Sequence, residues 1–232
     1  MSHPDLTVLL DDPQGQEALP LSPGARFRVV HRLRAQRAET VKNLFVLSSA
    51  LSLPDVAEVV SVANKRHRLR ALFVRADADA SWLPQMFERA NLRTLRNTLV
   101  HSGPSLPRRV LTAWGHGAQN ELIATASLAD DSLLVLTCAL ETLEVRFDQM
   151  PALKRIPEDH RSNFEVVEDG SFIHWPEPDI HLDVDAIRTA ISPELQEEAR
   201  GRRRVHDRRY GAAIAAFRKG AGLRQTDISG LS

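Results

Sequence analysis

A short run near the carboxyl end holds the residues whose type and spacing suggest chemistry most clearly. Six of the ten residues from Arg200 to Arg209 are arginines. Guanidinium groups keep their charge and form paired hydrogen bonds with phosphate oxygens. Neutralising about six phosphates would give non-specific nucleic-acid binding on the order of micromolar strength that weakens steeply with salt. The run therefore predicts phosphate contact, and the alternative is a solvated linker that pairs with the acids of residues 158–185.

Two groups of residues are expected to bind nucleic acid, and DNA is favoured over RNA as the partner. One group is the basic stretch Lys65, Arg66, Arg68 and Arg70, with Arg89, Arg93 and Arg96 nearby in sequence. The larger group lies near the carboxyl end and consists of Arg202, Arg203, Arg204, Arg208, Arg209, Arg218, Arg224 and Gln225.

The other expected partner is a second protein chain, either a different protein or another copy of this one.

The formal net charge of zero conceals four blocks of alternating sign. Residues 1–25 carry acids and no bases, with a net charge of −4, and residues 26–109 have a net charge of +10. Residues 110–195 have a net charge of −11, and residues 196–232 have one of +5. Such segregation indicates parts with separate partners, or basic and acidic parts that pair with each other. Nearly all of the positive charge is arginine, an excess that a GC-rich genome would also produce without any function.

A second cluster combines histidines and acids that could ligate a metal ion. The acids are explained more simply as turn and N-cap residues, so no metal and no cofactor is expected. The pair Ser48-Ser49 follows a run that could be a strand, and it could bind a small ligand at the end of a sheet. The histidine and acid cluster consists of His174, Glu177, Asp179, His181, Asp183 and Asp185.

Recognisable catalytic motifs are missing from the sequence. It contains no G-x-S-x-G, no H-E-x-x-H and no paired-cysteine motif, so the chain is not expected to be an enzyme. The glycine-flanked segment 114–117 has neither the phosphate-loop pattern nor a partner lysine, and it is expected to be a loop. Trp175 is expected to fill part of the core.

Composition places the chain among globular proteins. It has 232 residues, of which 43% are hydrophobic and 26% charged, enough for one large core or two small ones. Its apolar runs are too short to span a membrane, and its first residues lack the basic-then-apolar order of an export signal. The single cysteine, Cys138, lies in an apolar run and suits a reducing compartment. We therefore expect a cytoplasmic protein with no membrane partner and an inert, buried thiol.

The elements expected before residue 103 alternate between strands and helices. Residues 1–25 are expected to form an irregular acidic lead or an early extended segment. Residues 41–51 could share one helical face, although Leu44–Leu47 alone would also make a buried strand. The alternation predicts a small basic α/β domain over residues 26–103, with a mostly helical unit as the alternative. The other expected elements are strands over residues 26–33, 71–74 and 92–100, and helices over 54–66 and about 82–90, the last with Asp77, Asp79 and Ser81 as N-cap candidates.

Residues Gly103–Pro107 mark the expected domain boundary because prolines and a glycine cluster there. An acidic, β-rich α+β domain is expected over residues 110–192, and a basic helical tail over residues 193–232. The predicted fold class of the whole chain is therefore α+β. The elements expected in the acidic domain are strands over residues 122–126, 133–136, 143–147, 164–167 and 171–175, a helical patch over 151–156, and a closing helix after Asp183.

The segment from Asp169 to Asp185, which reads DGSFIHWPEPDIHLDVD, resembles the signature of a small bacterial domain family of unknown function. The signature is Ile-x-Trp-Pro followed by Asp-apolar-x-apolar-Asp, and the resemblance extends over about residues 120–191. It implies a β-rich α+β fold and supplies no catalytic residue. Members are often encoded beside helix-turn-helix domains, or fused to them, in small regulatory loci, which implies a regulatory context.

The last part of the chain, about residues 209–232, resembles the start of an Xre/Cro-type helix-turn-helix. Ile214 and Phe217 would form the apolar face of a first helix, and residues 224–226 would open a second. The resemblance implies a phosphate contact for Gln225. The chain stops where the recognition helix would begin, and without that helix no element fills the major groove. Either the chain is a truncated form of a longer regulator, or the half-motif is kept as a basic or protein-binding tail.

These features together predict a DNA-associated regulatory protein, such as a transcriptional regulator or an antitoxin-like factor. It would bind the phosphate backbone through its arginine-rich segments. The alternative is a non-catalytic interaction subunit of a larger nucleoprotein assembly from a defence or mobile-element locus. A small-molecule sensor built from residues 41–100 is a third hypothesis.

Overall fold

A computed structural model gives the fold, and the chain divides into two compact units, Met1–Val184 and Asp185–Ser232. The fold is mixed α and β, as the sequence predicted. None of the described helices is long and apolar enough to cross a membrane. The expected helical tail from residue 202 onward lies outside the described residues. The structure describes residues 6–19, 27–76, 83–92, 95–195, 197 and 201.

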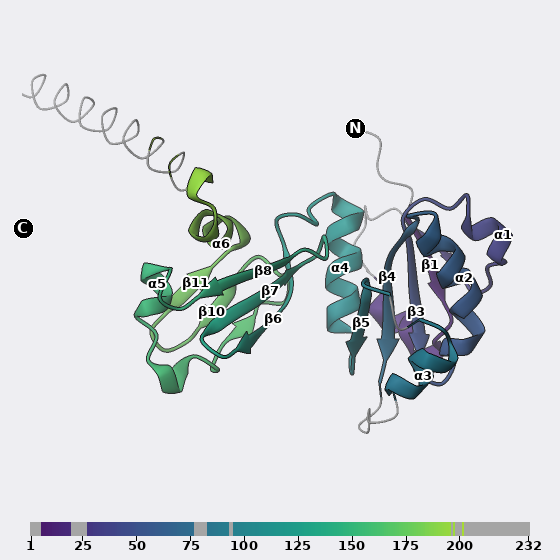
Figure 1. Ribbon diagram of the computed structural model, residues 1–232, viewed down its shortest axis with the longest axis horizontal. Coiled ribbons are helices and arrows are strands. Elements are labelled where there is room, and N and C mark those ends of the chain that lie inside the picture. Colours follow the sequence, from purple (N-terminus) through teal and green to yellow (C-terminus); the bar gives the residue numbers. More distant parts are fainter. Residues whose placement is uncertain are drawn as a thin grey trace, which may run out of the picture. The chain divides into compact units, whose positions relative to one another are not determined.

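A five-stranded parallel sheet forms the first part of the larger unit, in the order β2-β1-β3-β4-β5 (Figure 1). The direction of winding reverses between β1 and β3, which makes this junction the switch point of the sheet. The sheet confirms the α/β prediction for this region over the mostly helical alternative. Its strands are β1 (Leu6–Leu10), β2 (Phe27–Val30), β3 (Leu44–Ser49), β4 (Leu69–Arg75) and β5 (Thr98–His101).

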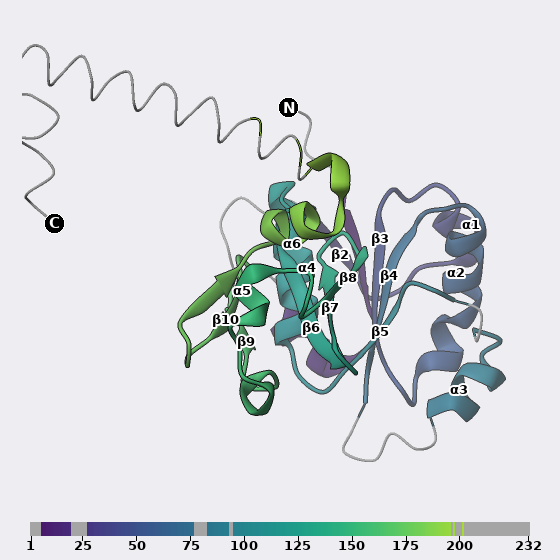
Figure 2. The ribbon, with the colours of Figure 1, turned by 60° about the vertical axis from the view of Figure 1, so that its left-hand side comes forward.

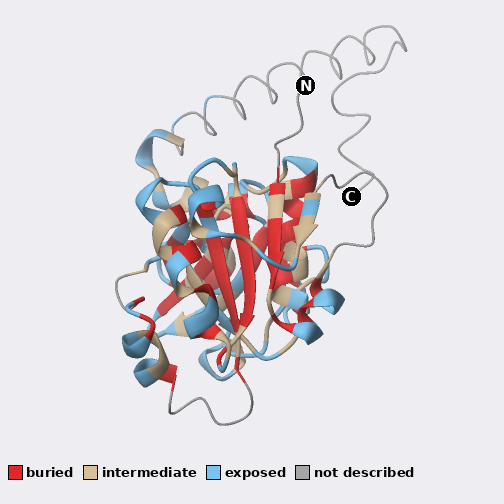
Figure 3. Ribbon diagram, turned by 90° about the vertical axis from the view of Figure 1, so that its right-hand side faces the viewer, coloured by how far each residue is buried: buried red, intermediate tan, exposed pale blue. Residues whose placement is uncertain are grey.

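Two segments that the sequence left open are strands in the middle of this sheet. β1 is extended, and every residue of it except Thr7 is buried. β3 contains five consecutive buried residues, Leu44–Ser48. A strand covered on both faces is apolar throughout and shows no alternation, so periodicity could not separate it from a helix. Figure 3 shows the central strands as a buried layer.

Helices cover both faces of the parallel sheet (Figure 1). One face packs against α1 (Ala35–Ala38), α2 (Leu53–Lys65) and α3 (Leu83–Arg89). The other face packs against α4 (Ser105–His116) and the 3₁₀ helix η1 (Pro13–Ala18). The apolar residues of β1 and β3 alternate between these two cores, which is why both strands read as continuous apolar runs.

α2 and α3 confirm two of the predicted helices. Pro54 lies in the first turn of α2, and Val56, Val60 and Ala63 face the core at helical spacing. Leu83 is buried at the start of α3. The N-cap candidates expected before α3 lie outside the described residues; they are Asp77, Asp79 and Ser81.

α4 contradicts one expectation, a loop over residues 114–117, and it begins within the segment Gly103–Pro107 that was expected to mark a domain boundary. The helix begins at Ser105 and ends at His116, with Gly117 as a left-handed cap at φ 73°. Pro107 fits because a proline in the first helical turn removes no intrahelical hydrogen bond. Trp114 packs edge-on against Phe45, and its Nε1 donates to the Cys138 carbonyl at 2.8 Å. Glycines and prolines therefore marked the ends of a helix here rather than a linker.

The second part of the larger unit contains two antiparallel three-stranded sheets (Figure 2). The strands predicted in this region are all present, and the helical patch is α5 (Pro151–Lys154). A short 3₁₀ helix, η2 (Glu158–His160), follows it. The strands are β6 (Ile123–Ala129), β7 (Ser132–Thr137) and β8 (Thr142–Arg146) in one sheet, and β9 (Glu165–Val166), β10 (Ile173–Trp175) and β11 (Ile180–Leu182) in the other.

β11 was not expected, because Pro176 and Pro178 argue against a strand. Both prolines lie instead in the turn between β10 and β11, where Asp179 has a left-handed backbone at φ 55°. The closing helix expected after Asp183 is α6 (Val184–Ile191). The turn thus reverses the chain between two short paired strands.

Two predictions about buried residues are confirmed. Trp175 is 1% exposed, and its Nε1 donates to the Arg161 carbonyl at 3.1 Å. Cys138 is fully buried, and burial raises the pKa of its thiol to about 12. A thiol of this kind carries almost no thiolate at neutral pH, so it is chemically inert in the folded protein.

Candidate functional site

The loops at the amino edge of the parallel sheet gather basic side chains. All strands of this sheet run the same way, so the segments that lead into β3, β4 and β5 emerge at one edge. Hydrogen bonds confirm the adjacency, since Leu44 N–H donates to the Arg68 carbonyl and Leu72 N–H to the Asn97 carbonyl, both at 2.8 Å. We call the resulting exposed set the basic amino edge; it consists of Lys42, Lys65, Arg66, Arg68, Arg70 and Arg96.

Members of the basic amino edge differ in how far their charge is engaged. The closest atoms of Arg66 and Glu39 are 3.7 Å apart, in an exposed ion pair. Arg70 donates from Nε to Asn43 Oδ1 at 2.7 Å, and its guanidinium lies 5.5 Å from the ring centre of Trp114. Among the described residues no ion pair involves the others, which are the cations available to an external anion: Lys42, Lys65, Arg68 and Arg96.

The structure brings together the four basic residues predicted between 65 and 70, together with Arg96, and adds Lys42, which the sequence reasoning missed. Of the other two arginines noted near this stretch, Arg89 ends α3 and Arg93 lies outside the described residues. Lys42 lies far from the stretch in sequence, and only the pairing of parallel strands places it at this edge. Deciding that Leu44–Leu47 is a strand would have been enough to find Lys42. The larger predicted group lies outside the described residues and is not placed; it comprises Arg202, Arg203, Arg204, Arg208, Arg209, Arg218, Arg224 and Gln225.

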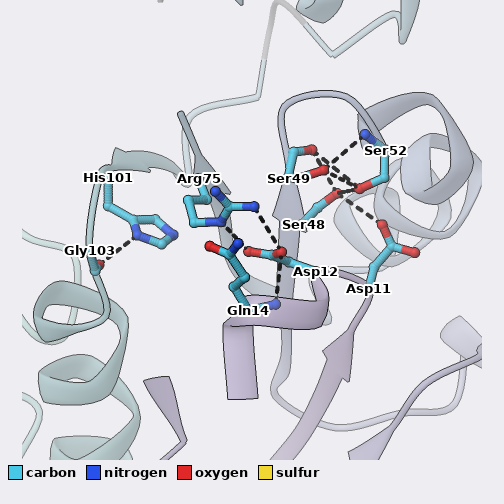
Figure 4. Close-up of polar contacts among 9 residues, drawn as sticks. All are labelled: Asp11, Asp12, Gln14, Ser48, Ser49, Ser52, Arg75, His101 and Gly103. Atoms are coloured by element: carbon cyan, nitrogen blue, oxygen red, sulfur yellow. Dashed lines mark hydrogen bonds and ion pairs between the residues drawn. The ribbon is translucent and has the colours of Figure 1, made fainter. Parts of the chain in front are cut away.

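The opposite, carboxyl edge of the sheet carries a buried ion pair (Figure 4). Arg75, at the end of β4, donates from Nε to Asp12 Oδ2 at 2.6 Å and from Nη2 to Asp12 Oδ1 at 3.1 Å. The backbone N–H of Gln14 also donates to Asp12 Oδ1, at 3.1 Å. Burial raises the pKa of Asp12, but these hydrogen bonds and the Arg75 charge outweigh it and lower the pKa below its usual value. Asp12 is therefore a carboxylate whose lone pairs are already in use.

His101, at the end of β5, lies next to this ion pair at the carboxyl edge (Figure 4). Its Nδ1 lies 2.8 Å from the Gly103 carbonyl, so Nδ1 carries the proton in the neutral ring. Burial lowers the pKa of His101, more strongly than the Gly103 contact and the Asp12 charge raise it. The imidazole therefore favours its neutral form beside the Asp12–Arg75 pair (Figure 4).

A cluster of hydroxyls lies at the switch point between β1 and β3 (Figure 4). Ser48 Oγ donates to Asp11 Oδ2 at 3.2 Å and lies 3.2 Å from Ser52 Oγ. Ser49 Oγ lies 2.7 Å from Ser52 Oγ. Ligands of open parallel sheets bind outside the carboxyl ends of the strands at such a junction. The expected position of Ser48-Ser49 at the end of a strand is therefore correct, and the cluster can offer both donors and acceptors to a polar ligand.

A cavity of about 610 Å³ lies between α4 and the turn before β10. Two arginines of α4 line it, but backbone carbonyls occupy their guanidinium groups. Arg109 donates from Nε to the Glu168 carbonyl at 3.1 Å and from Nη1 to the Ala124 carbonyl at 2.5 Å. Arg108 donates to the Glu17 carbonyl. Arg109 thus ties α4 to the β-rich part of the unit and Arg108 ties it to η1, so donors of both guanidinium groups are already engaged within the protein.

The histidine and acid cluster is partly assembled, although no metal was expected. His174, Asp179 and His181 each offer a ligand atom, and the three atoms lie within 4.8 Å of one another. Glu177 instead faces His160, with 3.2 Å between its Oε2 and Nδ1 of the histidine. The sequence reasoning missed this convergence because it depends on β11, which pairs His181 directly with His174.

Comparison with known proteins supports one of the two resemblances. No curated protein and no solved structure matches the chain. The comparison with protein families finds no helix-turn-helix in residues 209–232, so that resemblance stays a prediction. Residues 129–193, which include β7 to β11, match the family described as "Protein of unknown function (DUF2442)", and this match is consistent with the resemblance to a domain family of unknown function that the Trp-Pro signature carried.

Proposed function

We propose that the chain is a cytoplasmic, DNA-associated regulatory protein that acts by binding rather than by catalysis. In this proposal the basic amino edge and the arginines of residues 202–209 contact the phosphate backbone. The protein would serve as a transcriptional regulator or an antitoxin-like factor, and the partial helix-turn-helix near Gln225 would add a further phosphate contact.

One observation carries the proposal: four exposed cations from three separate loops share one edge of the sheet without an ion-pair partner among the described residues. Surface cations in a folded protein cost little when solvated, but their convergence creates a positive potential that attracts polyanions. Affinity supplied in this way is independent of DNA sequence and depends strongly on salt.

The acidic middle of the chain is suited to a different partner from the basic amino edge. Residues 110–195 have a net charge of −11, so this segment repels phosphate and is suited to contact other proteins. Their exposed carboxylates include Glu144, Asp148 and Glu165. A partner or a second copy of the chain would thus engage this segment while the basic edge stays on DNA.

The test uses the full chain and a fluorescently labelled DNA duplex of random sequence. Binding is measured by anisotropy between about 50 and 200 mM salt, a range over which phosphate contacts lose most of their affinity. The double variant Lys65→Gln, Arg68→Gln should lower the magnitude of the slope of log affinity against log salt by about two, because each phosphate contact contributes about 0.9.

A matched control removes the same charges elsewhere. The double variant Lys154→Gln, Arg155→Gln alters two exposed cations at the end of α5 and should leave the slope unchanged. Equal effects of the two double variants would contradict a specific role for the basic amino edge. Stoichiometric co-purification of a protein without any DNA binding would support the interaction-subunit alternative instead.

The contribution of the carboxyl-terminal arginines is measured separately. The triple variant Arg202→Gln, Arg203→Gln, Arg204→Gln should lower the slope by up to about three in the same assay. An RNA duplex of equal length provides the comparison of partners. Tighter binding to RNA than to DNA at every salt concentration would contradict the choice of DNA.

The hydroxyl cluster favours a second candidate function, recognition of a small polar effector at the switch point. Ser48, Ser49 and Ser52 together with Asp11 present donors and acceptors where open parallel sheets bind ligands. A thermal-shift screen of polar metabolites would test this function. A hit should raise the melting temperature of the wild type and lose its effect in Ser49→Ala, whereas an equal shift in that variant would exclude this site.

A further inference from the structure

Three side chains form a row across the sheet of β9, β10 and β11. Glu165 pairs with His174, and His174 pairs with His181, so the three lie side by side on adjacent strands. Ile173 and Trp175, the neighbours of His174, are buried on the other face of β10. Side chains alternate between the faces of a strand, so the row lies on the more exposed face. Short paired strands therefore hold these groups in fixed register.

The turn between β10 and β11 brings a carboxylate to the same place. Asp179 adopts the left-handed conformation, and its Oδ1 lies 3.6 Å from Nε2 of His174 and 3.8 Å from Nδ1 of His181. Ligand atoms around a tetrahedral zinc ion are about 3.3 Å apart when the bonds are about 2.0–2.1 Å long. The two separations from Asp179 exceed this value by a fraction of an ångström, and the ligand atoms of all three side chains lie within 4.8 Å of one another, so the side chains must rotate toward a common ion to bind it.

Each histidine has a neighbour that helps to orient its ring. Oε1 of Glu165 lies 3.7 Å from Nδ1 of His174, just beyond hydrogen-bond distance. Once the two side chains close this gap, the carboxylate would accept from Nδ1–H and leave the lone pair of Nε2 for the ion. The ring of His181 stacks on that of His174, with ring centres 4.3 Å apart and an angle of 7° between the ring planes. The ring of Phe172 lies T-shaped to that of His181, with ring centres 4.8 Å apart. Lone pairs lie in the plane of each ring, so binding of one ion by both rings requires them to turn out of this parallel stack.

We propose that Nε2 of His174, Nδ1 of His181 and a carboxylate oxygen of Asp179 bind a divalent transition-metal ion, for which Zn²⁺ is the best fit. Two imidazoles and one carboxylate are a ligand set for Zn²⁺ and its neighbours, whereas Ca²⁺ and Mg²⁺ prefer oxygen ligands alone. Three protein ligands leave a fourth position for water. The side chain of Asp179 is 82% exposed and that of His181 47%, so an ion can reach the site from solvent.

This inference does not depend on nucleic-acid binding, because the site lies in the family-matched segment and away from the basic amino edge in sequence. Its consequence for the fold is local. A bound ion would tie the turn that holds Pro176 and Pro178 to both strands and would fix the β10–β11 hairpin. Metal binding would thus stiffen one surface of the domain without altering its buried core.

The test titrates ZnCl₂ into the full, untagged chain and measures heat by calorimetry. We expect one ion per chain. His181→Ala and Asp179→Asn should each weaken binding at least tenfold, and asparagine is chosen because it tolerates the left-handed backbone at this position. Glu165→Gln should weaken binding by about tenfold, since partners of metal-bound histidines typically contribute this much. His116→Ala, which removes an exposed histidine at the end of α4, should bind like the wild type.

A second measurement does not depend on the folding of variants. Imidazole resonances of the wild-type chain are followed by NMR during the same titration. Those of His174 and His181 should shift together and saturate at one equivalent, while that of His116 stays unchanged. Absence of saturable binding, an unaltered affinity in His181→Ala, or shifts confined to other histidines would each overturn the proposal.

Discussion

Arg75 and Asp12 join the ends of β4 and β1 through two hydrogen bonds, from Nε at 2.6 Å and from Nη2 at 3.1 Å, across the intervening strand β3. The Asp12 side chain is only 2% exposed. A carboxylate removed from water in this way depends on its partner for compensation. The Asp12–Arg75 ion pair is therefore needed to stabilise the carboxyl edge of the sheet.

Replacement of Arg75 by glutamine should destabilise the protein by about 3–5 kcal/mol, because it leaves the Asp12 charge buried without its partner. Urea denaturation followed by circular dichroism measures the change. Arg146→Gln is the matched control, since Arg146 pairs with Asp148 at 3.0 Å on the exposed surface. Ion pairs on the surface contribute little to stability, so the unfolding free energy of this variant should stay close to that of the wild type. Similar losses in both variants would contradict a special role for the buried pair.

Stability should fall on acidification through His101. Burial lowers the pKa of His101 below its usual 6.5, so the folded protein resists protonation of this ring more than the unfolded chain does. The stabilising contribution is therefore complete above about pH 6.5 and is lost as pH falls from there toward the lower folded pKa. The difference in unfolding free energy between His101→Gln and the wild type, measured from pH 8 to pH 5, should shift in favour of the variant. A difference that is constant over this range would show that His101 titrates alike in both states.

Gly170→Ala should cost more stability than Gly117→Ala, although both glycines have a left-handed backbone. At Gly170, a Cβ would lie 2.5 Å from the Ile123 carbonyl oxygen and 2.7 Å from Cδ of Arg109, whereas at Gly117 it would meet nothing within 4 Å. The conformational penalty, about 1–2 kcal/mol, is common to both positions. The difference in melting temperature between the two variants therefore measures the steric clash at Gly170 alone. Equal melting temperatures would mean that the residues around Gly170 move aside without loss of stability.

The thiol of Cys138 should not react with a thiol reagent in the folded protein. Its pKa of about 12 and its complete burial leave neither thiolate nor access. Mass spectrometry after iodoacetamide treatment at pH 8 should show no adduct in buffer and one adduct in concentrated urea. Rapid labelling in buffer would reveal that β7 opens readily, because Cys138 directly follows that strand.

Sequence reasoning located the elements whose pattern reflects a single buried face. α2 has its proline in the first turn and valines at helical spacing, and β8 alternates polar with apolar residues, so local pattern and tertiary burial agree. The same reasoning could not decide between a helix and a strand for β3, because both faces of this strand are buried. α4 was missed because prolines at its start and a glycine at its end are also the signs of a loop.

The candidate sites were harder to predict than the elements, since they depend on pairing between distant segments. Lys65 and Arg68 were found as a contiguous run with Arg96 nearby in sequence, but Lys42 joins them only through the order of parallel strands. Asp12 and Arg75 are 63 residues apart, and nothing in the sequence marks them as partners. The three metal-binding candidates were considered together, yet their convergence required the register of β10 and β11.

The packing of α4 has a consequence for experiments that divide this chain into fragments. Val110 and Leu111 pack with Val8 and Phe45 of the parallel sheet, and the same apolar cluster includes Cys138 from the β-rich part. Cleavage near residue 104 would expose hydrophobic surface on both fragments. The fragments should therefore aggregate or stay associated, and they should not fold as independent domains.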